Sequence, residues 1–262
     1  MGIDLSDRTA QYCHLDASGE VEAAGRINLT PAGLQKAFGA LAPIRMAIET
    51  GAQSGWVKRC LEAMGHEVLV ANARELQSIS GNSRKSDQRD AEQLARVDPK
   101  LLKPVELRSE GQQLDLMRIR ARALLVDMRT KLVNGARGLA KVEGVRLPSS
   151  STGGFAARAK QSLGEKMLNV LGPLLQVIEQ LSAAITTSDE AIEQTAATQY
   201  PETRWLSQVP GAGKLTALTY VLTLGKAERF AHSRDVGPSD FTRCMRLNDV
   251  HPIAGPRVRA CC

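Results

Sequence analysis

The chain has 262 residues, which is enough for one large domain or two ordinary ones, each with its own core. A formal charge of +6 favours a polyanionic partner, and an aromatic content of only 3% leaves Leu, Val, Ile and Ala to form the cores. The five cysteines show no CxxC spacing and no apolar run approaches about 18 residues, which argues against zinc-finger, disulfide-scaffold, exported and membrane-spanning proteins.

Short apolar runs alternate with helical patterns over the first hundred residues. The expected strands are 2–6, 9–16, 21–29, 44–50 and 66–72, and the expected helices are 31–41 and 53–64. Strands that are linked by helices of this length imply a partly parallel α/β sheet.

The stretch GNSRKSDQRDAEQLARV, residues 81–97, places Asp87 and Asp90 one helical turn apart behind a basic loop. The basic residues around the pair are Arg84, Lys85 and Arg89. Alternating charges of this kind also occur on solvated helical faces with local ion pairs, so the stretch alone leaves both interpretations open.

Asp4 in the first strand and Glu49 at the end of a later one extend this pair to four carboxylates. In an RNase H-like sheet the first strand is central, so all four can converge at one edge. Carboxylates that lie this close repel one another unless a cation neutralises them. Oxygen ligands favour Mg²⁺ or Mn²⁺, and two such ions can stabilise in-line displacement at a phosphodiester.

From about residue 105 to residue 200 the pattern changes to long helices in antiparallel array. Apolar residues of the first helix recur in steps of three and four at Leu114, Met117, Ala121, Leu124, Met128, Leu132, Ala136 and Leu139. A second seam contains Leu168, Leu171, Leu175, Ile178, Leu181, Ile185 and Ile192. The seams fit either a coiled-coil arm or an ordinary bundle core. Because one domain face cannot bury both seams, we expect the chain to self-associate.

The segment WLSQVPGAGKLTALTYVLTLG, residues 205–225, contains a GAGK tetrapeptide. A nucleotide phosphate loop would need Gly where Gln208 stands and Ser or Thr where Leu215 stands, so that function is excluded. A short hairpin between two helices, in which Gly211, Gly213 and Lys214 hold a nucleic-acid phosphate, is one interpretation. A plain turn between helices is the other.

The segments GIDLS, AIETGAQSGW, VANARELQSISGNSRKSDQRDAEQLAR and LSQVPGAGKLTALTYVLTLGKAERFAHSRDVG together resemble the IS110-family transposases, in order, over residues 2–237. The resemblance implies an RNase H-like (RuvC-like) domain whose D-E-D-D metal set corresponds to Asp4, Glu49, Asp87 and Asp90. It also implies a C-terminal transposase domain with a Pro-Gly-x-Gly segment, matched here at residues 210–213. The expected organisation is residues 1–104 for the RNase H-like domain, 105–200 for the long helices, 201–237 for part of a mainly α C-terminal domain, and 238–262 for an aberrant tail.

The same resemblance implies metal-dependent cleavage and exchange of DNA strands by an insertion-sequence enzyme. Its expected partners are the element ends, the target DNA and a structured guide RNA, in a homodimer or homotetramer that is cytoplasmic and associated with the nucleoid. The alternatives are a RuvC-like structure-specific nuclease and a non-catalytic nucleic-acid-binding remnant.

Two departures from the family pattern affect these expectations. Only three residues precede Asp4, where relatives have several more. After residue 237 the family continues with a Leu-Gly-Leu-x-Pro stretch and a motif with a nucleophilic serine, which neither Ser233 nor Ser239 matches. Residues 238–262 also lack apolar periodicity and end in Cys-Cys. We therefore expect a frameshift near Pro238 and a copy that is defective in strand exchange.

Overall fold

The computed structural model describes residues 1–72, 87–98, 105–149, 152–225 and 236. The chain forms two compact units, Met1–Arg108 and Ser109–Cys262, and each is considered by itself. Arg84, Lys85 and the segment 237–262, to which the expectations on the basic loop and the tail refer, lie outside the described residues.

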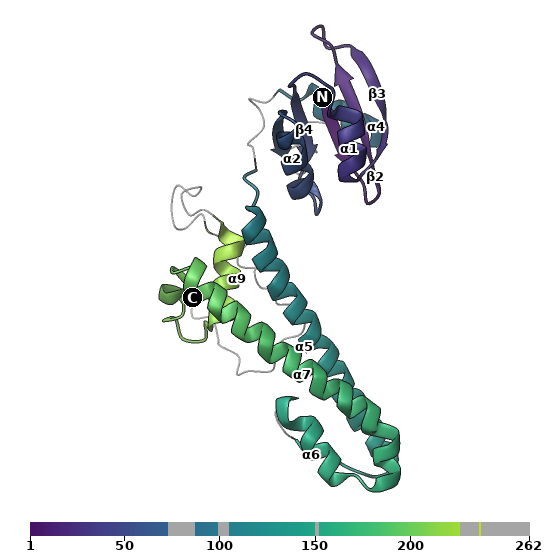
Figure 1. Ribbon diagram of the computed structural model, residues 1–262, viewed down its shortest axis with the longest axis vertical. Helices are drawn as coiled ribbons and strands as arrows, with labels where there is room; N and C mark the ends of the chain where they lie inside the picture. Colours follow the sequence, from purple (N-terminus) through teal and green to yellow (C-terminus); the bar gives the residue numbers. More distant parts are fainter. Residues whose placement is uncertain (73–86, 99–104, 150–151, 226–235, 237–262) are drawn as a thin grey trace, which may run out of the picture. The chain divides into compact units, whose positions relative to one another are not determined.

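The first unit contains a five-stranded mixed sheet with the order β3-β2-β1-β4-β5 (Figure 1). The first three strands are antiparallel neighbours, whereas β4 is parallel to β1 and β5 is parallel to β4. The α/β sheet expected from the sequence is therefore confirmed, with its first strand in the centre. The strands are β1 (Gly2–Leu5), β2 (Thr9–Leu15), β3 (Val21–Asn28), β4 (Arg45–Glu49) and β5 (Glu67–Ala71).

Helices cover the two faces of this sheet. On one face α1 (Pro31–Phe38) and α2 (Ser54–Ala63) bury the main core, in which Ile3 and Ile48 are fully buried. Helix α1 begins where Thr30 accepts a hydrogen bond from the Gly33 N–H and Pro31 occupies the first turn, a favourable pair of start signals. On the other face α4 (Asp87–Arg96) packs on β1, β2 and β4.

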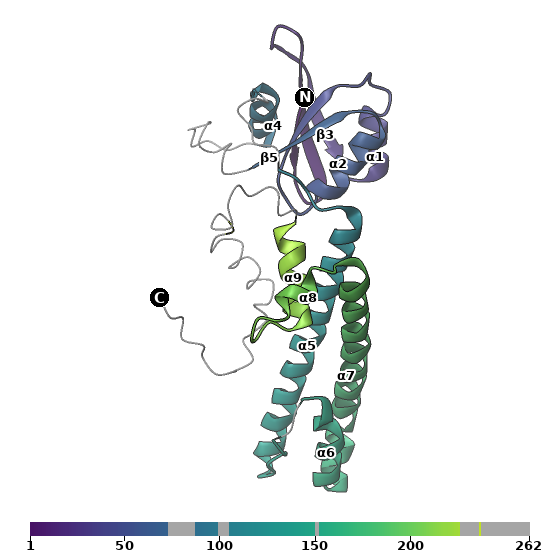
Figure 2. The same ribbon diagram turned by 90° about the vertical axis from the view of Figure 1, so that its left-hand side faces the viewer.

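The second unit is built on two long antiparallel helices, α5 (Glu110–Val142) and α7 (Glu165–Gln199), which lie side by side in both ribbon views (Figures 1 and 2). Helix α5 begins with a reciprocal capping box between Ser109 and Gln112. The shorter elements are η1 (Thr152–Gly154), α6 (Phe155–Ser162), α8 (Thr203–Leu206) and α9 (Lys214–Leu224).

Two apolar clusters hold this helical unit together at separate places. One lies where α6 packs on α5 and α7, around the buried side chains of Phe155 and Leu175. The other lies where α9 packs on the start of α5 and the end of α7, around Ile119 and Leu222. Between the two clusters the helices are joined by polar contacts, among them a two-fold hydrogen-bonded ion pair from Arg122 to Asp189 at 2.7 and 3.1 Å.

The two apolar seams predicted from the sequence differ in burial. The seam of α7 is the packing face: Leu171, Leu175, Ile178, Ile185 and Ile192 are all buried. Most of the α5 seam is exposed instead, and α5 packs through Leu116, Ile119, Val133, Ala136 and Ala140. Because Arg122 and Arg129 interrupt that inner face, its apolar periodicity was hidden in the sequence.

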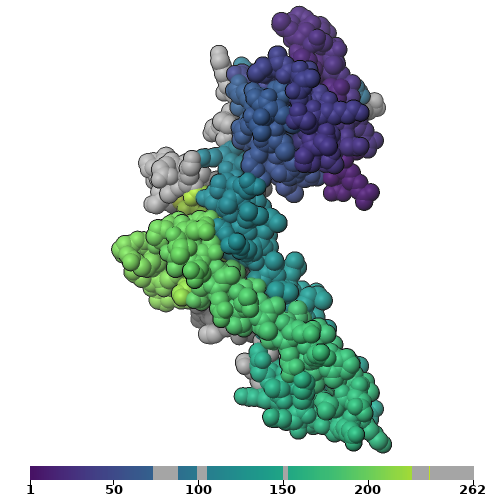
Figure 3. Space-filling view, viewed as in Figure 1, coloured from purple at the N-terminus to yellow at the C-terminus, as the bar shows by residue number. Residues whose placement is uncertain are grey.

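Helix α7 is the one helix among the described residues that is long and apolar enough to cross a membrane. Its buried side chains, such as Leu175 and Ile178, belong to the core shared with α5 and α6. Only 22% of its most apolar window is buried, and Val170 and Val177 are exposed. Figure 3 shows this arm in space-filling form, with α7 in green alongside the teal α5.

Candidate carboxylate site and nucleic-acid contacts

Asp4 and Glu49 lie on neighbouring parallel strands at the same level. The register pairs Gly2 with Ala47 and Ile3 with Ile48, so the next residues along the two strands are Asp4 and Glu49. Parallel neighbours are about 4.8 Å apart and residues in register face the same side of the sheet. Both carboxylates therefore lie at the carboxyl end of the sheet centre, and both side chains are half-buried.

The face on which they lie is the one that α4 covers. Side chains alternate along a strand, and Ile3 and Ile48 point into the core under α1 and α2. Gly2 and Ala47 therefore face α4, where Ala47 forms a small apolar cluster with Ala71 and Leu94. Asp4 and Glu49 are two residues further along their strands and share this face.

Gly2 lets α4 lie directly on β1. A Cβ atom at this position would come closer than 3.0 Å to the Ala91 carbonyl oxygen, the Ala95 nitrogen and the Leu94 Cβ. Two of these three atoms belong to the helix backbone, which cannot rotate away. No side chain larger than hydrogen fits beneath α4, and the sequence pattern did not single Gly2 out.

The direction of α4 follows from its contacts at the other end. The Arg96 guanidinium donates to the Gly19 carbonyl oxygen at 2.8 Å, and Gly19 lies in the turn after β2. Because β2 is antiparallel to β1 and pairs Cys13 with Gly2, this turn is beyond the amino end of β1. The first turn of α4, with Asp87 and Asp90, consequently points toward the edge at which Asp4 and Glu49 lie.

Contacts of Cys13 agree with this placement. Burial raises the pKa of the Cys13 thiol, and the nearby Glu92 carboxylate raises it further. Cys13 is paired with Gly2 in the sheet, so the middle of α4 passes over both residues. The thiol is a buried packing group beneath the helix.

Gln53 holds the loop that follows the first carboxylate. Its side-chain amide donates to the Ser6 carbonyl oxygen at 3.0 Å and to the Asp7 carbonyl oxygen at 2.9 Å. The turn between β1 and β2 is thereby tied to the start of α2. Neither composition nor spacing indicated this role, because it depends on two backbone oxygens 46 and 47 residues away.

The structure thus brings Asp4, Glu49 and the first turn of α4 to one edge and one face. Among the residues whose placement is described, no three His, Cys, Asp or Glu side chains form a group able to hold a metal ion. The side chain of Asp87 is outside that set, and Asp90 is half-buried on α4. Arg89 is exposed on the same helix.

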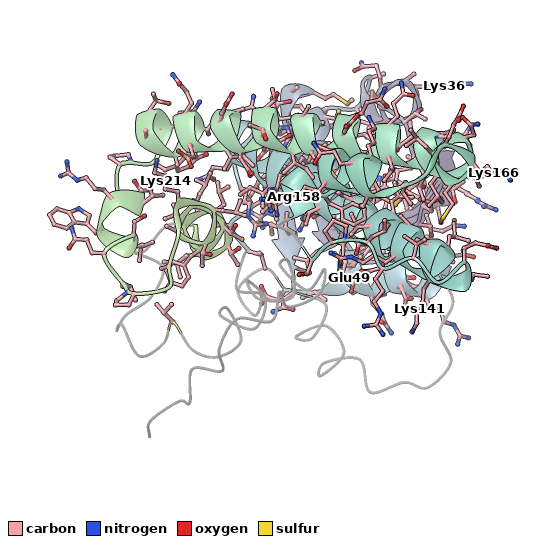
Figure 4. The ribbon with its side chains drawn as sticks, turned by 90° about the horizontal axis from the view of Figure 1, so that it is seen from below. Lys36, Glu49, Lys141, Arg158, Lys166 and Lys214 are labelled. Carbon is pink, nitrogen blue, oxygen red and sulfur yellow. The ribbon has the colours of Figure 1, made fainter. Side chains whose placement is uncertain are left out.

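The hairpin between α8 and α9 forms a second candidate contact. Gly211 has a φ of 87°, a left-handed conformation that favours glycine, and Gly213 begins α9 without a side-chain cap. Lys214 donates to the Glu193 carboxylate on α7 at 2.6 Å, and Figure 4 shows its side chain between the two helices. Lys214 is therefore engaged within the unit, although 61% of its side chain is exposed.

Trp205 is a feature of this hairpin that was not singled out from the sequence. It exposes 65% of its surface, and the Arg204 guanidinium lies 5.4 Å from the centre of its ring. Val209, four residues later, is also exposed. Tryptophan side chains are largely buried on average, so the exposure of Trp205 beside an arginine is unusual. The chain has only two tryptophans.

These features define a class of protein: an α/β unit with carboxylates gathered at one end of a mixed sheet, followed by a separate helical unit. The comparisons with known proteins give the family. The transposase model of the IS110 family, named for its DEDD residues, matches residues 1–142, more than half of the chain. The chain belongs to the IS110 family of transposases, as its sequence motifs indicated.

A curated relative extends this likeness beyond the matched region. The transposase for insertion sequence element IS1111A of Coxiella burnetii is 23% identical over 244 residues, which cover 90% of this chain. The aligned region spans 66% of the length of that relative. The similarity therefore includes the helical unit as well as the sheet.

Proposed function

We propose that this chain acts on DNA as an insertion-sequence transposase, through a metal-dependent carboxylate site on its N-terminal unit. The observation that carries the proposal is the register of the two central parallel strands, which sets Asp4 beside Glu49 on the face covered by α4. The match to the transposase family supports the proposed reaction class, cleavage and exchange of DNA strands.

The first unit is proposed to be RNase H-like, or RuvC-like. Its strand order, β3-β2-β1-β4-β5, in which β2 alone among these five strands runs opposite to the others, supports this assignment. A central first strand is what such a fold requires for its first carboxylate, and Asp4 lies on that strand.

Asp4, Glu49, Asp87 and Asp90 would hold Mg²⁺ or Mn²⁺. Their oxygen donors suit these ions, and half-buried carboxylates on adjacent strands repel each other unless a cation neutralises them. The bound ions would supply Lewis-acid stabilisation of charge at a phosphodiester. The chain itself contributes the carboxyl ends of β1 and β4, which hold Asp4 and Glu49. It also contributes the packing of α4 on β1, which fixes how far Asp87 and Asp90 lie from the sheet.

The partners of this site would be the element ends, the target DNA and a structured guide RNA, in a cytoplasmic, nucleoid-associated homodimer or homotetramer. Support for nucleic acid comes from the net charge of +6 and from the exposed Arg89 beside the carboxylates. Arg84 and Lys85 precede α4 in the chain and would contact phosphates near the metal ions. Gly211, Gly213 and Lys214 would hold a phosphate at the start of α9.

The test compares two substitutions on the same helix. Asp90→Asn removes a proposed ligand, whereas Glu92→Gln alters a neighbouring carboxylate that is paired with Arg96 at 2.9 Å. Millimolar Mg²⁺ should raise the melting temperature of the wild type and of Glu92→Gln but not of Asp90→Asn. Cleavage of structured DNA should follow the same pattern.

Two outcomes would decide against the proposal. If Mg²⁺ and Mn²⁺ leave the melting temperature of the wild type unchanged, the carboxylates are not a metal site. If the chain binds DNA without Mg²⁺-dependent nicking, it is a binding protein rather than a nuclease.

A further inference from the structure

The two strands that carry Asp4 and Glu49 stop pairing with each other just before these residues. Within β1 and β4, both of which the structure describes in full, the last paired residues are Ile3 and Ile48. On their other sides β1 stays paired with β2 as far as Leu5, and β4 stays paired with β5 as far as Glu49. The boundary between β1 and β4 is therefore where the sheet can open at the level of the two carboxylates.

A side chain from α2 spans this boundary. Gln53 donates one hydrogen bond to the Ser6 carbonyl oxygen at 3.0 Å and a second to the Asp7 carbonyl oxygen at 2.9 Å. Because both acceptors are carbonyl oxygens, the nitrogen end of the Gln53 amide faces the turn and donates to both. Ser6 lies two residues after Asp4, and Gln53 lies four residues after Glu49. Gln53 thus links the segments that directly follow the two carboxylates.

Both segments that Gln53 links are held by hydrogen bonds of their own. The turn after β1 is closed by the Ser6 N–H, which donates to the Thr9 carbonyl oxygen at 3.0 Å. The loop after β4 is tied to β5 by the Thr50 N–H, which donates to the Ala71 carbonyl oxygen at 2.9 Å. The same loop is closed by the buried Ser54 hydroxyl, which donates to the carbonyl oxygen three residues earlier at 2.8 Å. A contact between two such segments can fix the distance between the strands that precede them.

Helix capping does not account for a glutamine at this position. Gln53 is the N-cap residue of α2, and its side chain makes no capping hydrogen bond. The residues favoured at an N-cap are Ser, Thr, Asp and Asn, whose short side chains accept from the first turn of the helix. The longer amide of Gln53 reaches the turn after β1 instead.

We propose that Gln53 is a positioning residue of the candidate carboxylate site, which holds the carboxyl ends of β1 and β4 at the separation at which Asp4 and Glu49 share a divalent cation. Carboxylates this close repel each other, so without the contact the metal-free site would open. The cation would then have to draw the two strands together again, which lowers its affinity. This role rests on the proposed metal site and adds to it a residue that sets the affinity.

The expected size of the effect follows from the distance at which Gln53 acts. Groups that orient metal ligands from outside the coordination sphere change metal affinity by about 10–100-fold. Gln53 acts through the backbone that follows the ligands, so the lower end of this range, about tenfold, is expected.

The variant Gln53→Met removes the two donors and keeps the length of the side chain. The matched control is Lys58→Met on the same helix, where the Lys58 ammonium donates to the Val68 carbonyl oxygen at 3.1 Å, near the amino end of β5. Both variants lose a contact between α2 and a neighbouring segment, so both should melt below the wild type without metal. Only the contact of Gln53 lies at the carboxyl ends of β1 and β4.

Titration of the full chain with Mn²⁺, with free Mn²⁺ measured by electron paramagnetic resonance, gives the affinity without recourse to activity. Wild type and Lys58→Met should show the same dissociation constant, and Gln53→Met should show one about tenfold higher. Gln53→Ala also lacks the donors and should give the same loss, which keeps the test decisive if circular dichroism shows that Gln53→Met does not fold. An equal loss in Lys58→Met would mean that any loosening of α2 weakens the site, and would overturn the specific role of Gln53.

Asp90→Asn, which removes a proposed ligand, separates failure of this inference from failure of the proposed function. If wild type binds Mn²⁺, Asp90→Asn does not, and the Gln53 variants bind as the wild type does, the metal site stands and the role of Gln53 is wrong. If the wild type itself binds no Mn²⁺ at millimolar concentration, the proposed metal site is wrong and the role of Gln53 falls with it.

Discussion

At the residue scale, Gly2 is a position of the sheet at which no larger residue fits without a shift of α4. Gly2→Ala should destabilise the first unit by about 1–3 kcal/mol, because the added methyl group overlaps the backbone of α4. Thermal or urea unfolding of the variant measures this loss. If α4 is displaced rather than only strained, the stabilisation by Mg²⁺ should fall as well.

Gly51→Ala is the matched control for Gly2. A Cβ atom at Gly51 would meet no heavy atom within 4 Å, so this substitution should change stability by a few tenths of a kcal/mol at most. Equal melting temperatures for the two variants would contradict the close docking of α4 on β1.

Tyr200 should make the stability of the helical unit depend on pH in the alkaline range. Burial raises the pKa of Tyr200, and its hydrogen bond to the Asp115 carboxylate, at 2.8 Å, raises it further. A group that holds its proton more tightly when folded stabilises the fold fully below its ordinary pKa of about 10. That contribution is lost as the pH rises above this value.

The free energy of unfolding of the full chain should therefore decline as the pH is raised above about 10, and Tyr200→Phe should flatten the decline. At neutral pH the same variant should cost about 1–3 kcal/mol, because the buried Asp115 loses a donor and retains Arg118 at 3.1 Å. A decline that is identical in the two proteins would show that Tyr200 is not its source.

At the element scale, the sequence predicted the strands and helices well and the contacts of α5 poorly. Alternation and helix spacing are local properties, and they located β1, β4 and α2 within a few residues. Which face of α5 packs inward depends instead on partners 53 to 77 residues away, such as Ser182 for Arg129 and Thr195 for Arg118. The inward face mixes arginines with apolar residues, so hydropathy favoured the exposed face.

The candidate carboxylate site shows the same contrast between local patterns, which the sequence reveals, and contacts between distant residues, which it does not. Asp4 and Glu49 could be chosen from the sequence because Asp4 lies in the first expected strand and Glu49 ends a later one, and the expected central position of the first strand placed them at one edge. The roles of Gly2 and Gln53 could not be predicted. Gly2 is required because no Cβ atom fits beneath α4, and Gln53 donates hydrogen bonds to two carbonyl oxygens that are distant in the sequence. Both require the packed arrangement.

The hairpin between α8 and α9 carries a prediction that depends on the proposed function. An unpaired base stacked on Trp205 should quench its fluorescence, and in a Trp56→Phe background Trp205 is the one tryptophan left. Trp205→Ala should weaken binding of single-stranded DNA or RNA by about tenfold, and Trp205→Phe should weaken it less. Val209→Ala controls for the loss of apolar surface alone. Unchanged fluorescence on saturation with either nucleic acid would contradict stacking.

At the scale of the whole molecule, the chain divides after Arg108 into two compact units. The first unit has its own apolar core around the sheet. The helical unit has two further apolar clusters, and neither contains a residue of the first unit. The first unit should therefore fold without the second.

The point at which the first unit ends can be tested with two fragments. Val105 donates its N–H to the Val70 carbonyl oxygen at 3.0 Å, on edge strand β5, and Val105 and Leu107 pack against the main core. A fragment of residues 1–104 lacks these contacts, whereas a fragment of residues 1–108 keeps them. Both should show β-sheet by circular dichroism, but 1–108 should be more stable by about 2–4 kcal/mol, from one hydrogen bond and two partly buried side chains. If the two fragments melt at the same temperature, the segment after residue 104 belongs to the linker and not to the fold of the first unit.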